Sequence, residues 1–459
     1  RMAEVLNRVI EKAIRGSAPA QINVPRDYWT QVIDIELPPI VRFERQGGGK
    51  DAIDKAAKLL SESSFPVILS GAGVVIGNAI EDCKKLAEKL DAPVCSGYQH
   101  NDSFPGSHPL AVGPLGYNGS KAAMELISKA DVVLALGTRL NPFSTLPGYG
   151  IDYWPKNAKI IQVDMNPDRI GLTKKVTVGI AGDAKLVSKQ ILDKLSKNAG
   201  DKRREDRKNL IHQTKSAWLQ TLTSLDHEDD DPGTVWNKEA RERDKNRMSP
   251  RQAWRAIQAG MPEDVIISSD IGNNCAIGNA YPTFEKGRKY LAPGLFGPCG
   301  YGFPSILGAK IGCPKTPVIG FAGDGAFGIS MNEMSSCARE EWPAITMVIF
   351  RNYQWGAEKR NSILWFDDNF VGTELDPELS YSKVANACGL KGVTAKTMDE
   401  TTKAIKDSCK DQEKGITTFI EVILNQELGE PFRRDAMKKP VQVAGINKND
   451  MKPQKSLVE

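Results

Sequence analysis

The chain has 459 residues, of which 40% are hydrophobic and 41 are glycine, and its formal net charge is +4. This length predicts two or three domains with buried cores, and the near balance of charge gives no general preference for nucleic acid. No apolar run approaches the roughly 20 residues that a membrane-spanning helix needs, and no signal peptide is visible.

The eight cysteines and four histidines are scattered along the chain. No two cysteines form a Cys-x-x-Cys pair, and the histidines lack the spacing of zinc ligands. In a chain of this length, the pattern favours free thiols in a reducing cytoplasm and does not indicate a zinc site.

Residues 1–40 predict one helix and one strand. Apolar residues recur at helical spacing from Val5 to Ala13, and Ala20–Val24 is typical of a strand. One helix and one strand cannot bury a core, so we interpret residues 1–40 as the last part of a domain whose body precedes Arg1. Residues 41–49 end in three glycines and predict a linker.

Residues 50–195 alternate predicted helices and strands, which indicates a Rossmann-like parallel sheet with helices on both faces. The predicted strands are Pro66–Ser70, Val94, Val132–Leu136 and Lys159–Val163, and the predicted helices are Ile53–Leu60, Ile80–Leu90 and Lys121–Lys129. The loop from Gly71 to Gly77 follows a strand, but its glycine spacing departs from the dinucleotide fingerprint. We favour a tight turn there, with nicotinamide binding as the alternative.

The rest of the chain predicts a connection, a second domain and a tail. Residues 196–247 are densely charged, and we interpret them as a solvated connection with an exposed amphipathic helix around Trp218, Leu219 and Leu222. Residues 248–425 predict a second α/β domain. Residues 426–459 contain few apolar residues and predict a basic tail.

The tripeptide Gly323-Asp324-Gly325 stands at the end of a predicted strand, residues 316–322, and opens a helical stretch. A second apolar strand, residues 344–350, leads to Asn352, about 30 residues after the tripeptide. Because parallel strands place their carboxyl ends side by side, we expect Asp324 and Asn352 to lie together. One carboxylate with amide and backbone oxygens suits Mg²⁺. A surface turn is the alternative for the tripeptide alone.

Three more loops of the second domain carry polar or glycine-rich sequence. Residues 268–274 hold amides that suit phosphate oxygens, and residues 294–302 are rich in glycine, which permits a close approach of backbone to ligand. Residues 352–356 follow the last strand of the motif. Ala326 lies at a helix N-terminus, where free N–H groups favour anions. Each loop alone could be an ordinary connection, but all four should meet at one sheet edge.

Together the four loops resemble the diphosphate-binding domain of thiamine diphosphate enzymes of the acetohydroxyacid synthase-like branch. Residues 50–195 resemble the central domain of that branch, and residues 1–40 the end of its pyrimidine-binding domain. The resemblance implies that Asp324, the Asn352 side chain and the Gln354 backbone carbonyl hold Mg²⁺. It implies the following thiamine diphosphate-binding residues: Gly272, Asn273, Asn274, Gly297, Cys299, Gly323, Gly325, Ala326 and Asn352.

Five longer runs resemble those of sulfoacetaldehyde acetyltransferases, a family of this branch: residues 97–102, 113–121, 141–150, 350–360 and 430–439. The resemblance implies a cytoplasmic homodimer or homotetramer that converts sulfoacetaldehyde and phosphate into acetyl phosphate and sulfite. It places the cofactor-activating Glu before Arg1, so we assign no catalytic residue here and expect this chain alone to be inactive. An acetolactate synthase-like enzyme acting on 2-oxo acids and a non-catalytic subunit stay as alternatives, and flavin binding is left open.

Two positions depart from the family pattern. Arg351 stands where many relatives have a second Asn, and we do not expect it to bind the metal. Cys299 lies near the position of a large aliphatic residue under the thiazolium, so that support is not assigned.

The candidate substrate contacts lie in two stretches of the sequence, one that follows Asn352 and one in the C-terminal tail. Arginine forks suit phosphate and sulfonate, and a solvated tail is the alternative for the C-terminal ones. The candidates are Gln354, Trp355, Arg433 and Arg434, with Lys359 and Arg360 as further candidates for the substrate wall and Lys438 and Lys439 beside the arginines.

Overall fold

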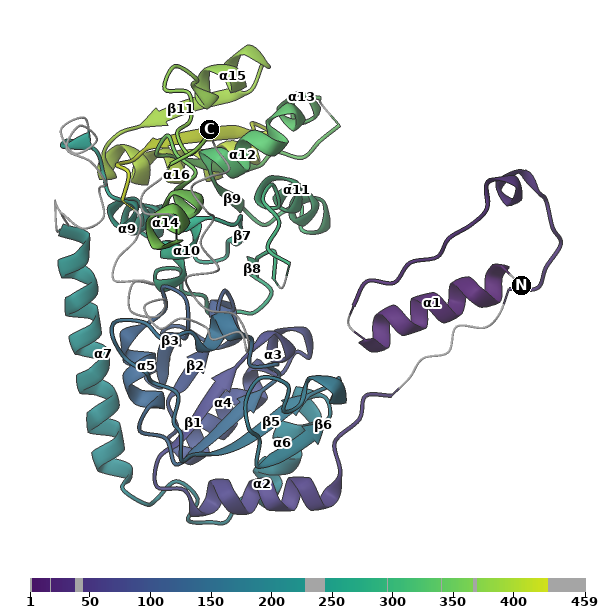
Figure 1. The fold of residues 1–459 in the computed structure, drawn as a ribbon, viewed down its shortest axis with the longest axis vertical. Coiled ribbons are helices and arrows are strands. Elements are labelled where there is room, and N and C mark those ends of the chain that lie inside the picture. The colour runs from purple at the N-terminus through teal and green to yellow at the C-terminus, as the bar shows by residue number, and fades with distance from the viewer. Residues whose placement is uncertain are drawn as a thin grey trace, which may run out of the picture.

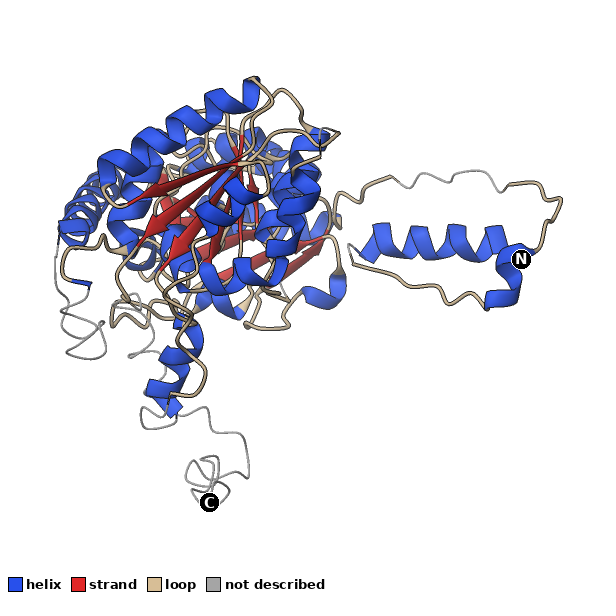
Figure 2. Ribbon diagram, turned by 90° about the horizontal axis from the view of Figure 1, so that it is seen from above, coloured by secondary structure: helices blue, strands red, loops and turns tan. Residues whose placement is uncertain are grey.

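The computed structural model describes residues 2–16, 18–37, 44–227, 244–294, 296–339, 341–365 and 370–427. Two six-stranded sheets, each made of parallel strands, form the body of the molecule and lie one below the other in Figure 1. Helices flank the strands in Figure 2. The α/β class predicted from the alternation of helices and strands is therefore confirmed.

The central sheet has the strand order β3-β2-β1-β4-β5-β6. Its strands are β1 (Pro66–Ser70), β2 (Val94–Ser96), β3 (Ala111–Pro114), β4 (Val132–Leu136), β5 (Lys159–Asp164) and β6 (Val178–Ala181). Its helices are α2 (Lys50–Glu62), α3 (Ala72–Ile76), α4 (Ile80–Leu90), α5 (Lys121–Ile127) and α6 (Ala184–Lys194). The strands β1 and β4 are buried along their whole length, as their continuous apolar runs predict.

The glycines after β1 allow two loops to touch. A Cβ on Gly73 would lie 2.6 Å from the Cα of Gly137, in the loop after β4, and a Cβ on Gly71 would lie 2.6 Å from the Gly137 carbonyl oxygen. The structure thus accounts for these glycines by close packing of the chain on itself.

The C-terminal sheet has the strand order β11-β12-β10-β9-β7-β8. Its strands are β7 (Ile266–Ser269), β8 (Tyr290–Leu291), β9 (Val318–Gly323), β10 (Thr346–Arg351), β11 (Lys391–Ala395) and β12 (Thr418–Ile423). Its helices are α9 (Pro250–Gly260), α10 (Asn273–Ile277), α11 (Gly302–Gly312), α12 (Asp324–Ser330), α13 (Met334–Cys337), α14 (Gly356–Trp365), α15 (Tyr381–Ala387) and α16 (Met398–Glu413).

Alternate residues of β10 enter two different cores, because side chains of a strand point to opposite faces of the sheet. Val348 and Phe350 pack in one core with Trp254 of α9 and Ile405 of α16. Met347 and Ile349 of the same strand pack in the other core, with residues of α11 and α15. The sheet is therefore covered on both faces.

Helix α7 (Arg204–His227) connects the two domains and runs along the side of the molecule in Figure 1. Its Ile211 belongs to the core of the central domain, whereas Trp218 and Leu222 are buried in a core of the C-terminal domain. The expectation of a solvated connection is wrong for this helix, because its apolar side packs on both domains. Leu219 remains exposed, as predicted.

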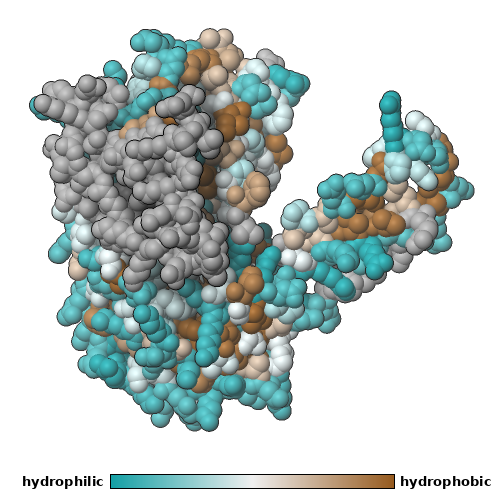
Figure 3. All heavy atoms as spheres, viewed as in Figure 1, coloured by the Kyte–Doolittle hydropathy of each residue, from teal (hydrophilic) through white to brown (hydrophobic). Residues whose placement is uncertain are grey.

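The N-terminal segment contains helix α1 (Met2–Gly16) and a short 3₁₀ turn, η1 (Arg26–Thr30). The predicted strand at Ala20–Val24 is absent, because no described strand lies beside it to share its hydrogen bonds. Helix α1 has no buried residue and stands apart from both sheets in Figures 1 and 2. Its apolar side chains, which include Val5, Leu6 and Ile10, are exposed, and Figure 3 shows hydrophobic atoms on the surface of this segment.

None of the helices in the described part of the chain is long and apolar enough to cross a membrane. The domain boundaries predicted above stay predictions, and most of the predicted tail lies outside the described residues.

Arg207 of α7 is buried and donates hydrogen bonds to five backbone carbonyl oxygens, of Ser64, Leu90, Asp91, Gly200 and Lys202. We predict that Arg207→Ala lowers the free energy of unfolding by about 2–4 kcal/mol, because these buried acceptors lose their donor. Denaturant unfolding measures the change. The control Lys208→Ala, at a half-exposed position of the same helix, should stay within about 0.5 kcal/mol of the unaltered protein. Equal losses in both variants would contradict this account of Arg207.

Candidate functional site

A hollow lies at the carboxyl ends of β7, β9 and β10, where the four predicted loops meet. It is lined by Ile271, Gly272, Asn273, Asn274, Cys299, Gly323, Asp324, Gly325, Ala326, Asn352, Gln354, Trp355, Gly356, Ala357 and Glu358. The residues predicted to bind the cofactor and the metal therefore line one hollow, with the exception of Gly297. The meeting follows from the sheet order, because β9 lies between β7 and β10.

The Asp324 carboxylate is buried and held by three donors. Its Oδ2 accepts from the backbone N–H of Tyr353 at 2.6 Å and from Arg351 Nη1 at 3.1 Å, and its Oδ1 accepts from the N–H of Gly325 at 2.9 Å. Burial raises the pKa of Asp324 to about 6, while Arg351 and the backbone donors oppose that rise. The carboxylate is thus fixed in position, and Oδ1 keeps room for a further ligand.

Arg351 lies fully buried between two acidic side chains. Its Nη1 pairs with Asp324, and its Nε lies 3.7 Å from Glu421 Oε1 on β12. Its guanidinium also covers the ring of Tyr353, with 4.1 Å to the ring centroid, and donates to the carbonyl oxygens of Asp376 and Leu379. Arg351 is thus the buried ion-pair partner of Asp324, the carboxylate predicted to bind the metal.

Several buried amide atoms around the hollow have no hydrogen-bond partner within the described part of the chain. They include the side-chain oxygens of Asn274, Asn352 and Gln354 and the nitrogen Nδ2 of Asn273. Unpaired buried polar atoms are costly, so native proteins leave few of them. Their concentration here fits a site that is completed by a bound group: a cation for the oxygens, and an acceptor such as phosphate for the Asn273 nitrogen.

The loop after β10 has an unusual backbone. Tyr353 adopts a left-handed conformation with φ of 62°, which is uncommon for a residue with a side chain. The loop pairs with a second segment through Trp355 N–H to Thr373 O and Leu375 N–H to Tyr353 O. These bonds bracket Gln354, whose own carbonyl oxygen accepts no backbone bond among the described residues. That oxygen is therefore available to a bound cation.

Trp355 covers the Gly-Asp-Gly turn. A Cβ on Gly325 would lie 2.9 Å from the Trp355 ring, so only glycine allows this contact. Trp355 thereby closes one side of the hollow beside the carboxylate.

Asp270 ties two of the predicted loops together. Its carboxylate accepts from the N–H groups of Gly300 and Gly302 and from that of Ile271. Burial raises the pKa of Asp270, against the effect of these donors. Cys299 is exposed and lines the hollow. Gly297, with φ of 66°, approaches Ile271 and does not line the hollow.

The sequence analysis missed the contribution of Tyr117. The Tyr117 hydroxyl donates to Asn273 Oδ1 at 3.4 Å and accepts a hydrogen bond from Arg360 Nη2. Tyr117 also packs against the rings of Tyr98 and Phe143. Four of these residues, Tyr98, Tyr117, Phe143 and Arg360, come from four of the five runs that resemble the family, and that resemblance was the signal in the sequence that could have pointed to them. Their contacts across the two domains could not be predicted from their spacing in the sequence.

The run from Gly97 to Asp102 is an interdomain contact. Gln99 N–H donates to Asn279 Oδ1, Asn101 Nδ2 donates to the Asn279 carbonyl, and Asp102 accepts from the N–H groups of Lys289 and Tyr290. Asn279 in turn donates to the Tyr117 carbonyl. This network holds Tyr117 beside the C-terminal domain.

The structure gives Lys359, a candidate for the substrate wall, a partner within the chain. Lys359 is buried and paired with Glu374, so its charge is already neutralised by this chain. Arg433 and Arg434, with Lys438 and Lys439, lie outside the described residues. The described chain reaches Gln426, whose carbonyl accepts from Gln354 Nε2 at 3.1 Å. The tail therefore begins beside the hollow.

Known protein families match both sheets. The thiamine pyrophosphate enzyme central domain matches residues 53–194, and the C-terminal TPP binding domain of the same enzymes matches residues 270–422. The second range contains the hollow and its four loops. These matches define the class: the chain has the domains of an enzyme that binds thiamine diphosphate.

Similar proteins narrow this class. A probable sulfoacetaldehyde acetyltransferase of Rhizobium meliloti is 76% identical over 457 residues, covering 100% of this chain and 77% of the relative. The sulfoacetaldehyde acetyltransferase of Roseovarius nubinhibens is 73% identical, covering 99% of this chain and 75% of the relative. A probable acetolactate synthase large subunit of Methanocaldococcus jannaschii is 30% identical, covering 89% and 68%. The chain belongs to the sulfoacetaldehyde acetyltransferase family, which confirms the resemblance seen in its sequence.

We predict that Arg351→Gln lowers the free energy of unfolding, without added cofactor, by about 3–5 kcal/mol, because it leaves Asp324 and Glu421 buried without their cation. Denaturant unfolding measures this loss. The control is Arg339→Gln, which breaks an exposed pair with Glu341 and should change stability by less than about 1 kcal/mol. A small effect of Arg351→Gln, similar to that of the control, would refute the account of the buried pair.

Proposed function

We propose that the chain binds thiamine diphosphate through Mg²⁺ held by the Asp324 carboxylate, the Asn352 side chain and the Gln354 backbone carbonyl. The observation that carries the proposal is the group of unpaired buried oxygens beside an anchored carboxylate. One charged and several neutral oxygen ligands suit Mg²⁺, which takes the rest of its shell from phosphate and water.

The diphosphate contacts come from the remaining loops of the hollow. The backbone around Gly272 and Ala326 offers N–H groups, Gly325 lets the chain approach the ligand closely, and Asn273 Nδ2 is a buried donor without a partner among the described residues. When bound, thiamine diphosphate supplies a carbon nucleophile and an electron sink. Asp324 and its neighbours would fix the position of that nucleophile by holding the diphosphate end.

The reaction that we propose follows the family: sulfoacetaldehyde and phosphate give acetyl phosphate and sulfite. The carbon–sulfur bond breaks, and sulfite leaves with the bonding electron pair. The aldehyde carbon reaches the oxidation level of an acyl group while the adjacent carbon becomes a methyl group, so no external oxidant is needed. The acyl carbon then forms its new bond to a phosphate oxygen.

Both substrates are anions, and we assign their binding to cations around the mouth of the hollow. Arg360 is buried beside Tyr117, which contacts Asn273 of the hollow. Arg433 and Arg434 follow Gln426 by seven and eight residues. An extended chain spans at most about 3.5 Å per residue, so these arginines can reach the hollow from its rim, within roughly 25–28 Å. Gln354 and Trp355 complete the candidate substrate wall.

We also propose that the protein is cytoplasmic and forms a homo-oligomer. Its domains would have the boundaries predicted from the sequence. Every cysteine is a free thiol in the structure, which suits a reducing compartment.

Product analysis tests the reaction. With thiamine diphosphate, Mg²⁺ and phosphate present, the full-length protein, which includes the Glu expected before Arg1, should release sulfite from sulfoacetaldehyde and form acetyl phosphate in equal amounts. Formation of acetolactate from pyruvate, without sulfite release from sulfoacetaldehyde, would favour the acetolactate synthase alternative. Absence of cofactor binding would favour the non-catalytic subunit.

We predict that Asp324→Ala abolishes the Mg²⁺ dependence of thiamine diphosphate binding, because it removes the only charged ligand of the proposed set. Calorimetric titration of the cofactor with and without Mg²⁺ measures the effect. The matched control is Glu358→Ala, which removes an exposed acid that lines the same hollow and should leave the Mg²⁺ dependence intact. An unchanged Mg²⁺-dependent affinity in Asp324→Ala would rule out this metal assignment.

We predict that, in the full-length protein, Arg433→Ala or Arg434→Ala lowers kcat/KM by roughly 30- to 1000-fold for phosphate or for sulfoacetaldehyde. Such a loss corresponds to about 2–4 kcal/mol for a charged contact made out of water. Steady-state kinetics with each substrate varied in turn identifies the anion, and Lys439→Ala serves as a control in the same basic stretch. Kinetic constants within about 0.5 kcal/mol of the unaltered enzyme in both arginine variants would indicate a solvated tail.

A further inference from the structure

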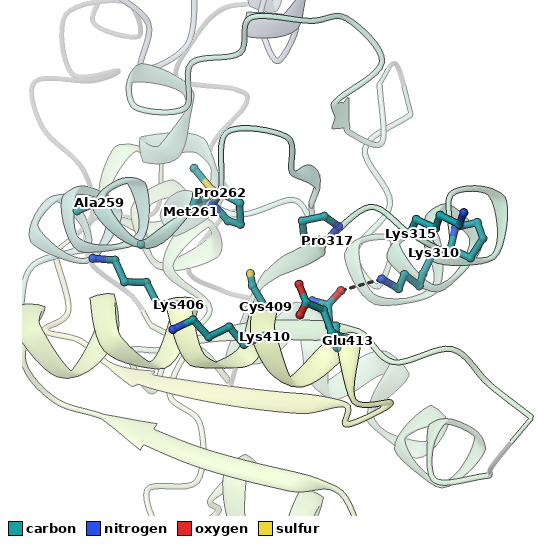
Figure 4. A pocket seen from close by; sticks show the side chains of 13 residues that line it. Ala259, Met261, Pro262, Lys310, Lys315, Pro317, Lys406, Cys409, Lys410 and Glu413 are labelled. Carbon is teal, nitrogen blue, oxygen red and sulfur yellow. Dashed lines mark hydrogen bonds between the residues drawn. The ribbon is translucent and has the colours of Figure 1, made fainter.

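A second cavity, with a volume of about 710 Å³, lies at the amino-terminal ends of strands in the C-terminal sheet, on the side opposite to the cofactor loops. Figure 4 shows it between the end of α9, the end of α11 and the last turns of α16. Met261 and Pro262 precede β7, and Pro317 precedes β9. The cavity therefore lies at the start of strands whose other ends carry Asp270 and Asp324, and it is separate from the site described above.

The walls of this cavity are held firmly by buried contacts. Helix α9 packs so closely on α16 that a Cβ on Gly260 would lie 2.9 Å from the Thr402 carbonyl oxygen. The Gln412 side chain accepts from the N–H of Val318 on β9 and donates to the Val318 carbonyl and to Thr346 Oγ1 on β10. Because Gln412 is anchored to two strands, the cavity is preformed, which limits the ordering cost of a ligand.

Lys310 places a buried positive charge in the cavity wall. Its side chain is almost fully buried, and its Nζ donates to the Thr316 carbonyl at 2.9 Å and to Gln412 Oε1 at 3.2 Å. Both acceptors are neutral, and no carboxylate of the described residues lies within 4.0 Å of this ammonium. Burial lowers the pKa of Lys310. A buried charge without an ion-pair partner is costly. Glu413, which lines the same cavity, partly opposes the fall in this pKa, and an anion bound in the cavity would add a direct counter-charge.

Three further lysines surround the same space. Lys315 lies on the loop after α11, and Lys406 and Lys410 lie on successive turns of α16, as Figure 4 shows. Glu413 is the one acid among the residues that line the cavity. The apolar part of the lining comes from Met261 and the prolines that precede the strands. The cavity thus combines an excess of positive charge with a small apolar surface.

We propose that this cavity binds a small phosphorylated organic anion of about the size of a mononucleotide. Its phosphate groups would lie against Lys310, Lys406 and Lys410, since lysine binds phosphate as a point charge. Its ring or other apolar portion would pack on Met261 and Pro262. The volume lies within the range of small-molecule sites, roughly 300–1,000 Å³.

Calorimetric titration with ADP tests the proposal, with thiamine diphosphate and Mg²⁺ at saturating concentration so that the first site is already filled. The double variant Lys406→Glu/Lys410→Glu should bind ADP at least about tenfold more weakly, because two attractive charges become repulsive. Lys315→Glu changes the opposite wall and should also weaken binding. All three side chains are exposed, so these variants keep the fold.

The matched control is Lys403→Glu, which lies on the same helix, pairs with Asp407 and does not line the cavity. It should leave ADP affinity unchanged, and AMP should bind more weakly than ADP to the unaltered protein because it carries less charge. The proposal is overturned if ADP does not bind at millimolar concentration. It is equally overturned if the cavity variants and the control bind ADP with the same affinity.

Discussion

The buried ion pair between Asp324 and Arg351 is the constraint on which the arrangement of the site depends. Asp324 follows β9, Arg351 ends β10, and Glu421 lies on β12, so three neighbouring strands each supply one charge. Desolvating three charges is costly, and the cost is offset only while their geometry is kept. The strand ends therefore cannot shift independently, and the Asp324 carboxylate stays in one place.

The same geometry explains why the rest of the hollow is polar yet incomplete. Three donors fix the Asp324 carboxylate, whereas the neighbouring amide oxygens of Asn352 and Gln354 are left without partners among the described residues. In the proposed site, these oxygens would be oriented before a metal binds. The left-handed Tyr353 is part of the same solution, because its N–H is turned toward Asp324.

A second constraint joins the two domains. Arg207 and Ile211 attach α7 to the central domain, and Trp218 attaches it to the C-terminal domain. Asn279 accepts a hydrogen bond from the backbone of Gln99 and donates one to the carbonyl oxygen of Tyr117. These bonds hold Tyr117 near Asn273. The central domain thus supports the site through the contact of Tyr117 with Asn273, although its own strand-end loops pack against each other.

Local patterns in the sequence were sufficient to predict the fold class, most strand positions and the placement of Asp324 and Asn352 at neighbouring strand ends. Buried strands such as Pro66–Ser70 and Val132–Leu136 are continuous apolar runs, and Asp324 and Asn352 follow strands at a recognisable spacing, so local pattern sufficed. Tertiary structure alone decided which distant residues meet. It paired Arg351 with Asp324 and Glu421, buried Trp218, joined Tyr117 to Arg360, and left Ala20–Val24 without a strand partner. The physical reason is that burial, ion pairing and strand pairing depend on neighbours from other parts of the chain, and spacing along the sequence does not encode which neighbours those are.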